Sequence, residues 1–276
     1  MCPPSEIGRE IAPKIGLIAG QGDLPVRLVT RWESQGIVPV IVALHGVTPS
    51  SLIHNRIGRF FSIGQAGHIL AFLKDNGVTT LVMAGGLKRP NFWTLRTDMV
   101  GLWVIAKLIV RRFGDDGLLK FLRREIEQQG IQVMGVQDFL PEIVCPAGVL
   151  GTVFPTPEQD AMIATGFLAA KRHGAADKGQ SIVITPQGHI SFETAEGTNA
   201  LIVSCAGQAG AILVKVSKPQ QDLALDMPTI GPGTMDAILK AGLKGIAVEA
   251  GKTILLDRDR VVRMCNDYGV FMMGVS

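Results

Sequence analysis

Aromatic residues, paired cysteines and paired histidines are scarce in this sequence. Aromatic residues make up 5% of the 276 residues. The four cysteines, Cys2, Cys145, Cys205 and Cys265, form no CxxC pair, and the five histidines form no HExxH or other paired spacing. A zinc site is therefore not indicated, and the thiols are expected to be reduced and mostly buried, as in a cytoplasmic protein.

Long apolar runs and a strong net charge are also lacking. Residues 1–13 contain no apolar core, so no signal peptide is expected. The longest apolar candidate, 99–110, is interrupted by Lys107 and falls short of the roughly 18 residues that a membrane span needs. The formal net charge of +3 gives no indication of a nucleic-acid partner. Neither a GxSxG elbow nor a Walker loop occurs.

Apolar residues and glycine are abundant. Hydrophobic residues make up 47% of the chain, and there are 33 glycines, which favours α/β layers joined by tight turns. We predict a Rossmann-like, parallel-sheet N-terminal domain and a smaller α+β C-terminal domain. The predicted boundaries are an N-terminal arm at 1–13, the Rossmann-like domain at 14–137, a connector at 138–156 in which Pro and Gly break up regular structure, and the C-terminal domain at 157–276.

The first domain opens with a strand, a glycine turn and a helix. The strand 14–19 leads into Gly20, Gln21 and Gly22, and a helical pattern follows at 26–35. The third glycine of a dinucleotide fingerprint is replaced by Pro25, and no acidic residue ends the second strand. The turn is therefore interpreted as a phosphate- or nucleotide-approaching loop, or as a simple tight turn, rather than as an NAD site.

A second glycine loop follows the predicted central strand 80–84. Gly85 and Gly86 would let the backbone approach a ligand, and Arg89 or Lys88 could lie near an anion. Loops at the carboxyl ends of parallel strands build the ligand crevice of such sheets. The alternative is a solvated basic turn.

Two further segments of the first domain allow two interpretations each. The helix predicted at 98–113 carries Trp103 and an apolar stripe, so it is either a core helix, the more common case, or a surface for a membrane or an acyl chain. Asp115 and Asp116 stand at the start of the next helix, where capping explains them; they are also candidate metal ligands.

The second domain contains two predicted hairpins and one proline-rich loop. The hairpins pair 180–185 with 189–193 and 244–249 with 253–256. The loop spans 215–234, where three prolines exclude both a central strand and a helix. Its two lysines, the acid Asp226 and the following helix start are typical of a phosphate or metal site. Alternatively, Thr234 caps the next helix and Asp226 caps a turn.

Taken together, these pieces resemble one family, the magnesium-dependent UDP-2,3-diacylglucosamine pyrophosphatases of the LpxI type. The resemblance spans nearly the whole chain after residue 13. It rests on an ordered set of short matches: Gly16–Gly20 with Gly22, Leu24 and Pro25; Ala84-Gly85 with Arg89, Pro90 and Phe92; Gly114-Asp115-Asp116 with Leu118 and Leu119; Glu196-Gly197-Thr198; Lys218-Pro219 with Gln221; Asp226 with Pro228–Gly231; and Gly269–Phe271 with Gly274 and Val275.

The resemblance implies a two-domain hydrolase with its active site between the domains. It would cleave UDP-2,3-diacylglucosamine into UMP and 2,3-diacylglucosamine 1-phosphate (lipid X), with water attacking the β-phosphate. Asp226 matches the key acid of the DxPTIG motif and would serve catalysis, Mg²⁺ binding or both; Asp116 is a second candidate metal ligand. Lys218 and Arg89 would neutralise diphosphate charge. The implied substrate-binding residues are Gly20, Gln21, Gly22, Gly85, Gly86, Arg89, Thr198, Asn199, Lys218, Gln221, Thr229 and Gly231.

The resemblance implies a lipid-linked UDP-sugar as the partner molecule. It also implies a cytoplasmic location with transient contact with the inner-membrane surface, and it is compatible with a homodimer.

Two positions depart from the family pattern. Asn199 stands where an Asp is usual, and Ala224 where an Arg is frequent. Asn can still offer Mg²⁺ a carbonyl oxygen, but it supplies no charge.

Three other functions are compatible with parts of the sequence. A non-catalytic nucleotide-binding module would share the first domain without needing Asp226. A lipid carrier would bind lipid X without Mg²⁺. An NAD(P)-linked oxidoreductase is suggested only by the first strand-glycine-helix unit.

Overall fold

The computed structural model describes residues 13–86, 97–101 and 115–276. The predicted arm, Arg89, Trp103 and most of the helix predicted at 98–113 lie outside these residues. The chain divides into two units: Met1–Phe113 with Lys120–Phe139, and Gly114–Leu119 with Leu140–Ser276. Each unit is described by itself.

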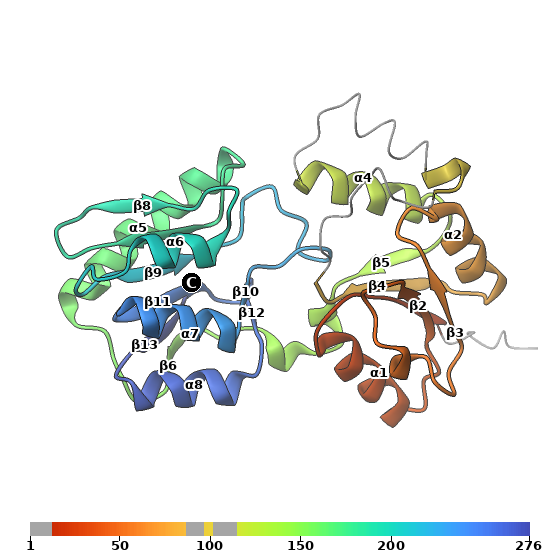
Figure 1. Ribbon diagram of the computed structural model, residues 1–276, viewed down its shortest axis with the longest axis horizontal. Coiled ribbons are helices and arrows are strands. Elements are labelled where there is room, and N and C mark those ends of the chain that lie inside the picture. The colour runs from red at the N-terminus through yellow and green to blue at the C-terminus, as the bar shows by residue number, and fades with distance from the viewer. Residues whose placement is uncertain (1–12, 87–96, 102–114) are drawn as a thin grey trace, which may run out of the picture. The chain divides into compact units, whose positions relative to one another are not determined.

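The first unit is built on a five-stranded parallel sheet of order β3-β2-β1-β4-β5 (Figure 1). The strand order reverses between β1 and β4, where open α/β sheets bind their ligands. The elements are β1 (Ile15–Ala19), α1 (Leu24–Ser34), β2 (Val40–Leu44), a 3-10 turn η1 (Ser50–Leu52), β3 (Gly58–Phe61), α2 (Ala66–Asp75), β4 (Thr80–Ala84), α4 (Asp115–Glu127, of which the part from Lys120 onward belongs to this unit), β5 (Gln132–Met134) and a 3-10 turn η3 (Val136–Asp138).

Helices cover both faces of this sheet (Figure 1). Ile69 and Leu73 of α2 pack on one face with β-strand residues such as Val42 and Leu81. The buried side of α1 includes Trp32, whose ring meets Phe139 edge-on at 5.2 Å. Because both faces are buried, the central strands are apolar throughout rather than alternating. The sequence therefore predicts β1, β2 and β4 well.

The two glycine loops of the first unit pair with each other at the carboxyl ends of β1 and β4. Gln21 and Gly86 exchange backbone hydrogen bonds of 2.8 and 2.9 Å, and the Gly20 amide donates to Ala84 at 2.7 Å. A Cβ on Gly20 would lie 2.7 Å from the backbone of Gly85. Glycine is required here because the two backbones are in contact.

The second unit is built on a six-stranded mixed sheet of order β6-β13-β11-β9-β7-β8, with β9, β11 and β13 parallel. Strands β6, β7 and β8 run antiparallel to their neighbours. The elements are a 3-10 turn η4 (Pro141–Ile143), β6 (Gly148–Leu150), α5 (Pro157–Ala175), β7 (Ser181–Ile184), β8 (Ile190–Phe192), α6 (Thr198–Ser204), β9 (Ile212–Lys215), β10 (Thr229–Ile230), α7 (Pro232–Ala241), β11 (Gly245–Glu249), β12 (Ile254–Leu255), α8 (Arg258–Asp267) and β13 (Phe271–Val275).

Two separate apolar layers cover the faces of this sheet. Alternate residues of β9 take part in the two layers, since successive side chains point to opposite faces. Ile212 and Val214 pack with α5, whereas Leu213 packs with α6, α7 and α8 (Figure 1). Helix α5 begins at Pro157, because Thr156 caps it by accepting from the Gln159 amide.

The structure corrects several details of the prediction. The hairpin predicted for 244–249 and 253–256 is wrong: β11 pairs in parallel with β9 and β13, and β12 pairs with β10. The predicted connector is not wholly irregular, because β6 joins the sheet beside β13. Since residues from Leu140 onward belong to the second unit, that unit is not the smaller one. Helix α7 already begins at Pro232, so Thr234 is not its cap.

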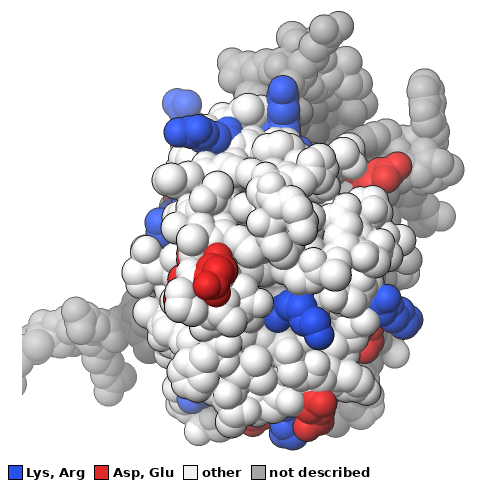
Figure 2. Space-filling model, turned by 90° about the vertical axis from the view of Figure 1, so that its left-hand side faces the viewer, with Lys and Arg blue, Asp and Glu red and all other residues white. Residues whose placement is uncertain are grey.

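The described surface and thiols agree with the composition. On the face in Figure 2, Lys and Arg side chains are interspersed with Asp and Glu over a mostly uncharged surface. Cys145, Cys205 and Cys265 are buried and unpaired. Within the described ranges, no helix combines the length and apolar character that crossing a membrane requires.

Substitution of Gly85 by Ala is expected to destabilise the first unit by about 2 to 4 kcal/mol. Gly85 has φ +93°, and a Cβ there would lie 2.5 Å from the Gln21 carbonyl oxygen. Gly86→Ala is the matched control, because no atom lies within 4 Å of the position that a Cβ would take there. Chemical denaturation measures both. Equal stabilities of the two variants would contradict the close approach of these loops.

Candidate functional site

The proline-rich loop leaves the sheet at the carboxyl end of β9, between the layers that α5 and α6 occupy. Lys215, the last residue of β9, lies opposite Ser181 of β7 in the sheet register. The loop returns as β10, which pairs with β12, and then enters α7. Its acidic residue Asp226 is half-buried, whereas Lys215 is only 5% exposed. A charged side chain this deeply buried needs polar partners nearby.

Lys215 finds those partners on three elements. Its Nζ donates to Thr198 Oγ1 at 2.7 Å, at the start of α6, and to Ser181 Oγ at 3.4 Å. The carboxylates of Glu193 and Asp226 attract it electrostatically. Burial lowers the pKa of Lys215, and the two carboxylates oppose that shift without cancelling it.

Glu193 fixes the other side of this cluster. Its Oε1 accepts from Thr198 Oγ1 at 2.7 Å, and its Oε2 accepts from the Gln180 amide at 2.7 Å. With Thr198 donating its single proton to Glu193, the hydroxyl accepts from Lys215 and from Ser181 at 3.1 Å. Glu193 therefore connects the start of α6 to the start of β7 and keeps the Thr198 oxygen directed at the ammonium group.

Asp226 is held from the opposite end of the loop. Gln221 Nε2 donates to Asp226 Oδ2 at 2.6 Å, and Gln221 Oε1 accepts from the Lys218 amide at 3.0 Å. The Gln221 amide orientation is thereby set by two partners. No described residue donates a hydrogen bond to Asp226 Oδ1. This carboxylate is thus oriented by one oxygen while the other is left for a water molecule or a cation.

A second charged cluster lies where β9 and β11 end. Glu249 Oε2 accepts from Lys171 Nζ at 2.6 Å and from Ser217 Oγ at 2.6 Å, and Lys252 Nζ reaches Oε1 at 3.0 Å. Burial raises the pKa of Glu249, but these hydrogen bonds outweigh burial and lower the pKa to about 2. The cluster ties α5 to the loop that follows β9.

The donor set around Asp226 suits Mg²⁺ only if the substrate supplies ligands too. Among the residues described, no group of three or more His, Cys, Asp or Glu side chains is placed to hold a metal ion. Mg²⁺ is commonly held by one or two carboxylates together with water and phosphate oxygens. Asp226 with its available Oδ1 fits that arrangement.

The structure brings together some of the predicted residues and separates others. Thr198, Gln221 and Asp226 belong to one cluster. Lys218 instead forms an ion pair with Asp177 at 2.7 Å. Asn199 is exposed on α6. Thr229 Oγ1 donates to the Met227 carbonyl at 3.1 Å, and Gly231 directly precedes α7. Asp116 lies in α4, and its side chain is outside the described part of the structure. The loop Gly20–Gly22 pairs with Gly85-Gly86 in the first unit.

Glu193 is a cluster residue to which the sequence assigned no role, and Lys215 was noted only as one of the two lysines of the loop. One signal for Lys215 was present: a lysine near the end of the apolar run 211–216 is a charge in a predicted buried strand. Such a residue requires an acidic or hydroxyl partner. Glu193 gave no comparable signal, because it stands at the end of a predicted hairpin strand, outside any apolar run.

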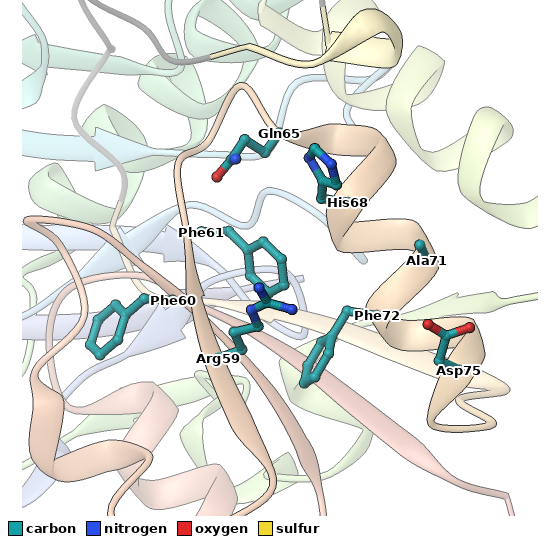
Figure 3. A pocket seen from close by; sticks show the side chains of 8 residues that line it. All are labelled: Arg59, Phe60, Phe61, Gln65, His68, Ala71, Phe72 and Asp75. Atoms are coloured by element: carbon teal, nitrogen blue, oxygen red, sulfur yellow. The ribbon is translucent and has the colours of Figure 1, made fainter.

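The first unit has a surface pocket of about 350 Å³ between β3 and α2. Arg59 lies over the Phe61 ring at 5.6 Å, and Phe61 meets Phe72 at 5.4 Å (Figure 3). Gln65, His68 and Asp75 also line it. None of the predicted site residues lies among its lining residues.

The fold and the cluster describe a protein of two α/β units, the second carrying an oriented, half-buried carboxylate beside a buried lysine. Models of the LpxI N-terminal domain and the LpxI C-terminal domain match residues 14–143 and 146–273. The chain is 36% identical over 274 residues to "UDP-2,3-diacylglucosamine pyrophosphatase LpxI" of Caulobacter vibrioides, covering 95% of this chain and 98% of that protein. The chain belongs to the LpxI family.

Solved structures give only distant similarities. The biotin carboxylase domain of a Hydrogenobacter thermophilus 2-oxoglutarate carboxylase shares 13% identity, with a TM-score of 0.28, over 64% of this chain and 37% of that chain. Rhizobium etli pyruvate carboxylase shares 9% identity, with a TM-score of 0.29, over 66% of this chain and 17% of that chain. TM-scores this low do not indicate a common fold.

Acid is expected to remove the stabilisation that Glu249 provides. Its folded pKa of about 2 lies below the ordinary 4.5, so the contribution is present above about pH 4.5 and is lost as the pH falls toward 2. Allowing for solvent screening, we expect about 2 kcal/mol. Denaturant titrations between pH 7 and pH 2 should show a flatter pH dependence for Glu249→Gln than for the intact protein. Glu196→Gln, at an exposed position, is the control. Parallel curves for Glu249→Gln and the intact protein would contradict this assignment.

Proposed function

We propose that this protein hydrolyses the diphosphate of UDP-2,3-diacylglucosamine to 2,3-diacylglucosamine 1-phosphate and UMP, a step of lipid A biosynthesis. The observation that carries the proposal is the 36% identity over nearly the full length of both chains to a relative named for this substrate. The geometry around Asp226 supports it, because a carboxylate beside a buried ammonium group suits hydrolysis of a phosphoanhydride.

Asp226 is proposed to act on the attacking water. Gln221 holds Oδ2, so Oδ1 can accept a proton as the water oxygen bonds to the β-phosphorus. The bond between the β-phosphorus and the bridging oxygen breaks, and the bridging oxygen leaves with UMP. The proton stays on Asp226 until solvent takes it. Water supplies the new oxygen of the sugar 1-phosphate, so the step balances without another reactant.

Mg²⁺ is part of the proposal. The Asp226 carboxylate would hold it together with oxygens of the diphosphate. When bound, the ion would neutralise negative charge on the transferring phosphoryl group. Asp226 can orient the water or contact the ion, or do both, while Gln221 keeps the carboxylate in one orientation.

We propose that the first unit binds the nucleotide, as is typical of Rossmann-like domains with this strand order. The glycine loops lie at the carboxyl ends of β1 and β4, where the strand order reverses. This position is typical of nucleotide sites in open α/β sheets. We assign the uridine nucleotide to these loops. The location of the active site between the domains stays a prediction of the family resemblance.

The acyl chains of the substrate extend the proposal to the membrane. Two acyl chains require an apolar surface, so we propose a cytoplasmic protein in transient contact with the inner-membrane surface. A homodimer stays a prediction.

Asp226→Asn is expected to lower kcat by roughly a hundredfold or more, because the amide cannot accept the proton. Purified protein is incubated with UDP-2,3-diacylglucosamine and Mg²⁺ in ¹⁸O-labelled water, and products are read by mass spectrometry. The label should enter the sugar 1-phosphate and not UMP.

Asp236→Asn, an exposed site on α7, is the control and should retain full turnover. Label in UMP would move the attack to the α-phosphate. Binding of the UDP-sugar without turnover by the intact protein would replace the enzyme by a nucleotide-binding module, with Asn199 and Ala224 as the first positions to revert.

Removal of divalent ions is expected to abolish turnover, and added Mg²⁺ should restore it. Asp226 supplies the ion with few ligands, and the diphosphate and water supply the others, so a chelator can remove it. Without the ion, the negative charge on the transferring phosphoryl group is no longer neutralised. Activity is measured after EDTA treatment and dialysis, with Mg²⁺ titrated back. Full activity in EDTA would exclude a Mg²⁺ requirement.

A further inference from the structure

Most basic side chains described near the loop are paired with carboxylates other than Asp226. Lys218 pairs with Asp177 at 2.7 Å, and its role at the phosphates stays a prediction. Lys171 and Lys252 pair with Glu249 at 2.6 and 3.0 Å. Lys215 differs from these three, because its charge interacts with Asp226.

The hydrogen bonds of Lys215 leave donor capacity unused. An ammonium group has three N–H bonds and no acceptor. The described residues supply two acceptors, Thr198 Oγ1 at 2.7 Å and the weaker Ser181 Oγ at 3.4 Å. Glu193 uses both carboxylate oxygens for Thr198 and the Gln180 amide, so it attracts Lys215 without a direct hydrogen bond among those described. One N–H therefore has no acceptor among the described residues and can donate to an anion.

The surroundings also fix the position of this charge. Lys215 ends a central strand, and the hydroxyl that anchors its Nζ is itself oriented by Glu193. A cation so placed needs no rearrangement when charge develops beside it, and burial strengthens its field. Surface lysines lack both properties.

We propose that Lys215 is a catalytic residue of this site, whose ammonium group contacts a phosphate oxygen of the diphosphate and stabilises the negative charge that grows there during hydrolysis. This inference rests on the proposed function. It adds Lys215 to Lys218 and Arg89, the residues that the family resemblance predicts to neutralise diphosphate charge. Glu193 is then a positioning residue, because it acts through Thr198.

UDP and uridine binding test the proposal by isothermal titration calorimetry. Lys215→Met keeps the side-chain volume and removes the charge, and it should weaken UDP binding at least tenfold while leaving uridine binding unchanged. Turnover should fall by roughly a hundredfold, with Lys215→Arg retaining more of both. Lys252→Met, which removes an exposed lysine near the same sheet edge, should change neither quantity.

The outcomes separate this inference from the proposed function. Hydrolysis by the intact protein together with unchanged UDP affinity and kcat in Lys215→Met would overturn the role of Lys215 and leave the function standing. Failure of the intact protein both to hydrolyse the substrate and to bind UDP would overturn the function itself.

If Lys215→Met does not fold, an NMR measurement on the intact protein tests the contact between Lys215 and the phosphate. The ¹⁵Nζ resonance of Lys215, assigned by its disappearance in Lys215→Arg, should shift on addition of UDP and not of uridine. No shift with UDP at saturation would overturn the contact.

Discussion

A single buried ammonium group constrains much of the second unit. Removing the charge of Lys215 from water is costly, and the cost is offset only if hydroxyl and carboxylate groups converge on it. Those groups come from β7, from the end of the β7–β8 hairpin, from the start of α6 and from the loop beyond β9. Their convergence joins the start of α6 to the sheet through Thr198, Lys215 and Ser181, while Gln221 orients Asp226. Stability and the proposed chemistry therefore depend on the same contacts.

The first unit is constrained by close backbone contact instead of charge. The loops after β1 and β4 approach until Gln21 and Gly86 share two hydrogen bonds, and only glycine at positions 20 and 85 permits that approach. Strands β1 and β4 are neighbours because the sheet order reverses between them. The loops therefore lie at the carboxyl ends of two neighbouring strands, where open α/β sheets commonly bind ligands.

Local signals predicted most of the elements. Central strands buried on both faces are apolar runs, so the strands predicted at 14–19 and 80–84 agree with β1 and β4 to within one residue. The wrong hairpin at 244–256 shows the limit of such signals. Two apolar runs around Ala250-Gly251-Lys252 satisfy the local pattern of a hairpin, yet β11 gains more by pairing in parallel with β9 and β13 in the core. Strand β3, at the edge of its sheet, carries too weak a pattern to be recognised.

The candidate site was likewise predicted in part from local motifs, while its other contacts depend on the tertiary structure. The family motif identified Asp226, Gln221 and Thr198 by residue type and order, and the structure brings these three into one cluster. It could not predict that Lys218 meets Asp177 whereas Lys215 is buried beside Thr198. The sequence by itself determined the α/β class and the family and predicted Asp226 as the acidic site residue, since each depends on composition or on short ordered motifs. Only the tertiary structure decided which lysine is buried beside Thr198, because contacts between residues far apart in the chain follow from strand pairing and burial.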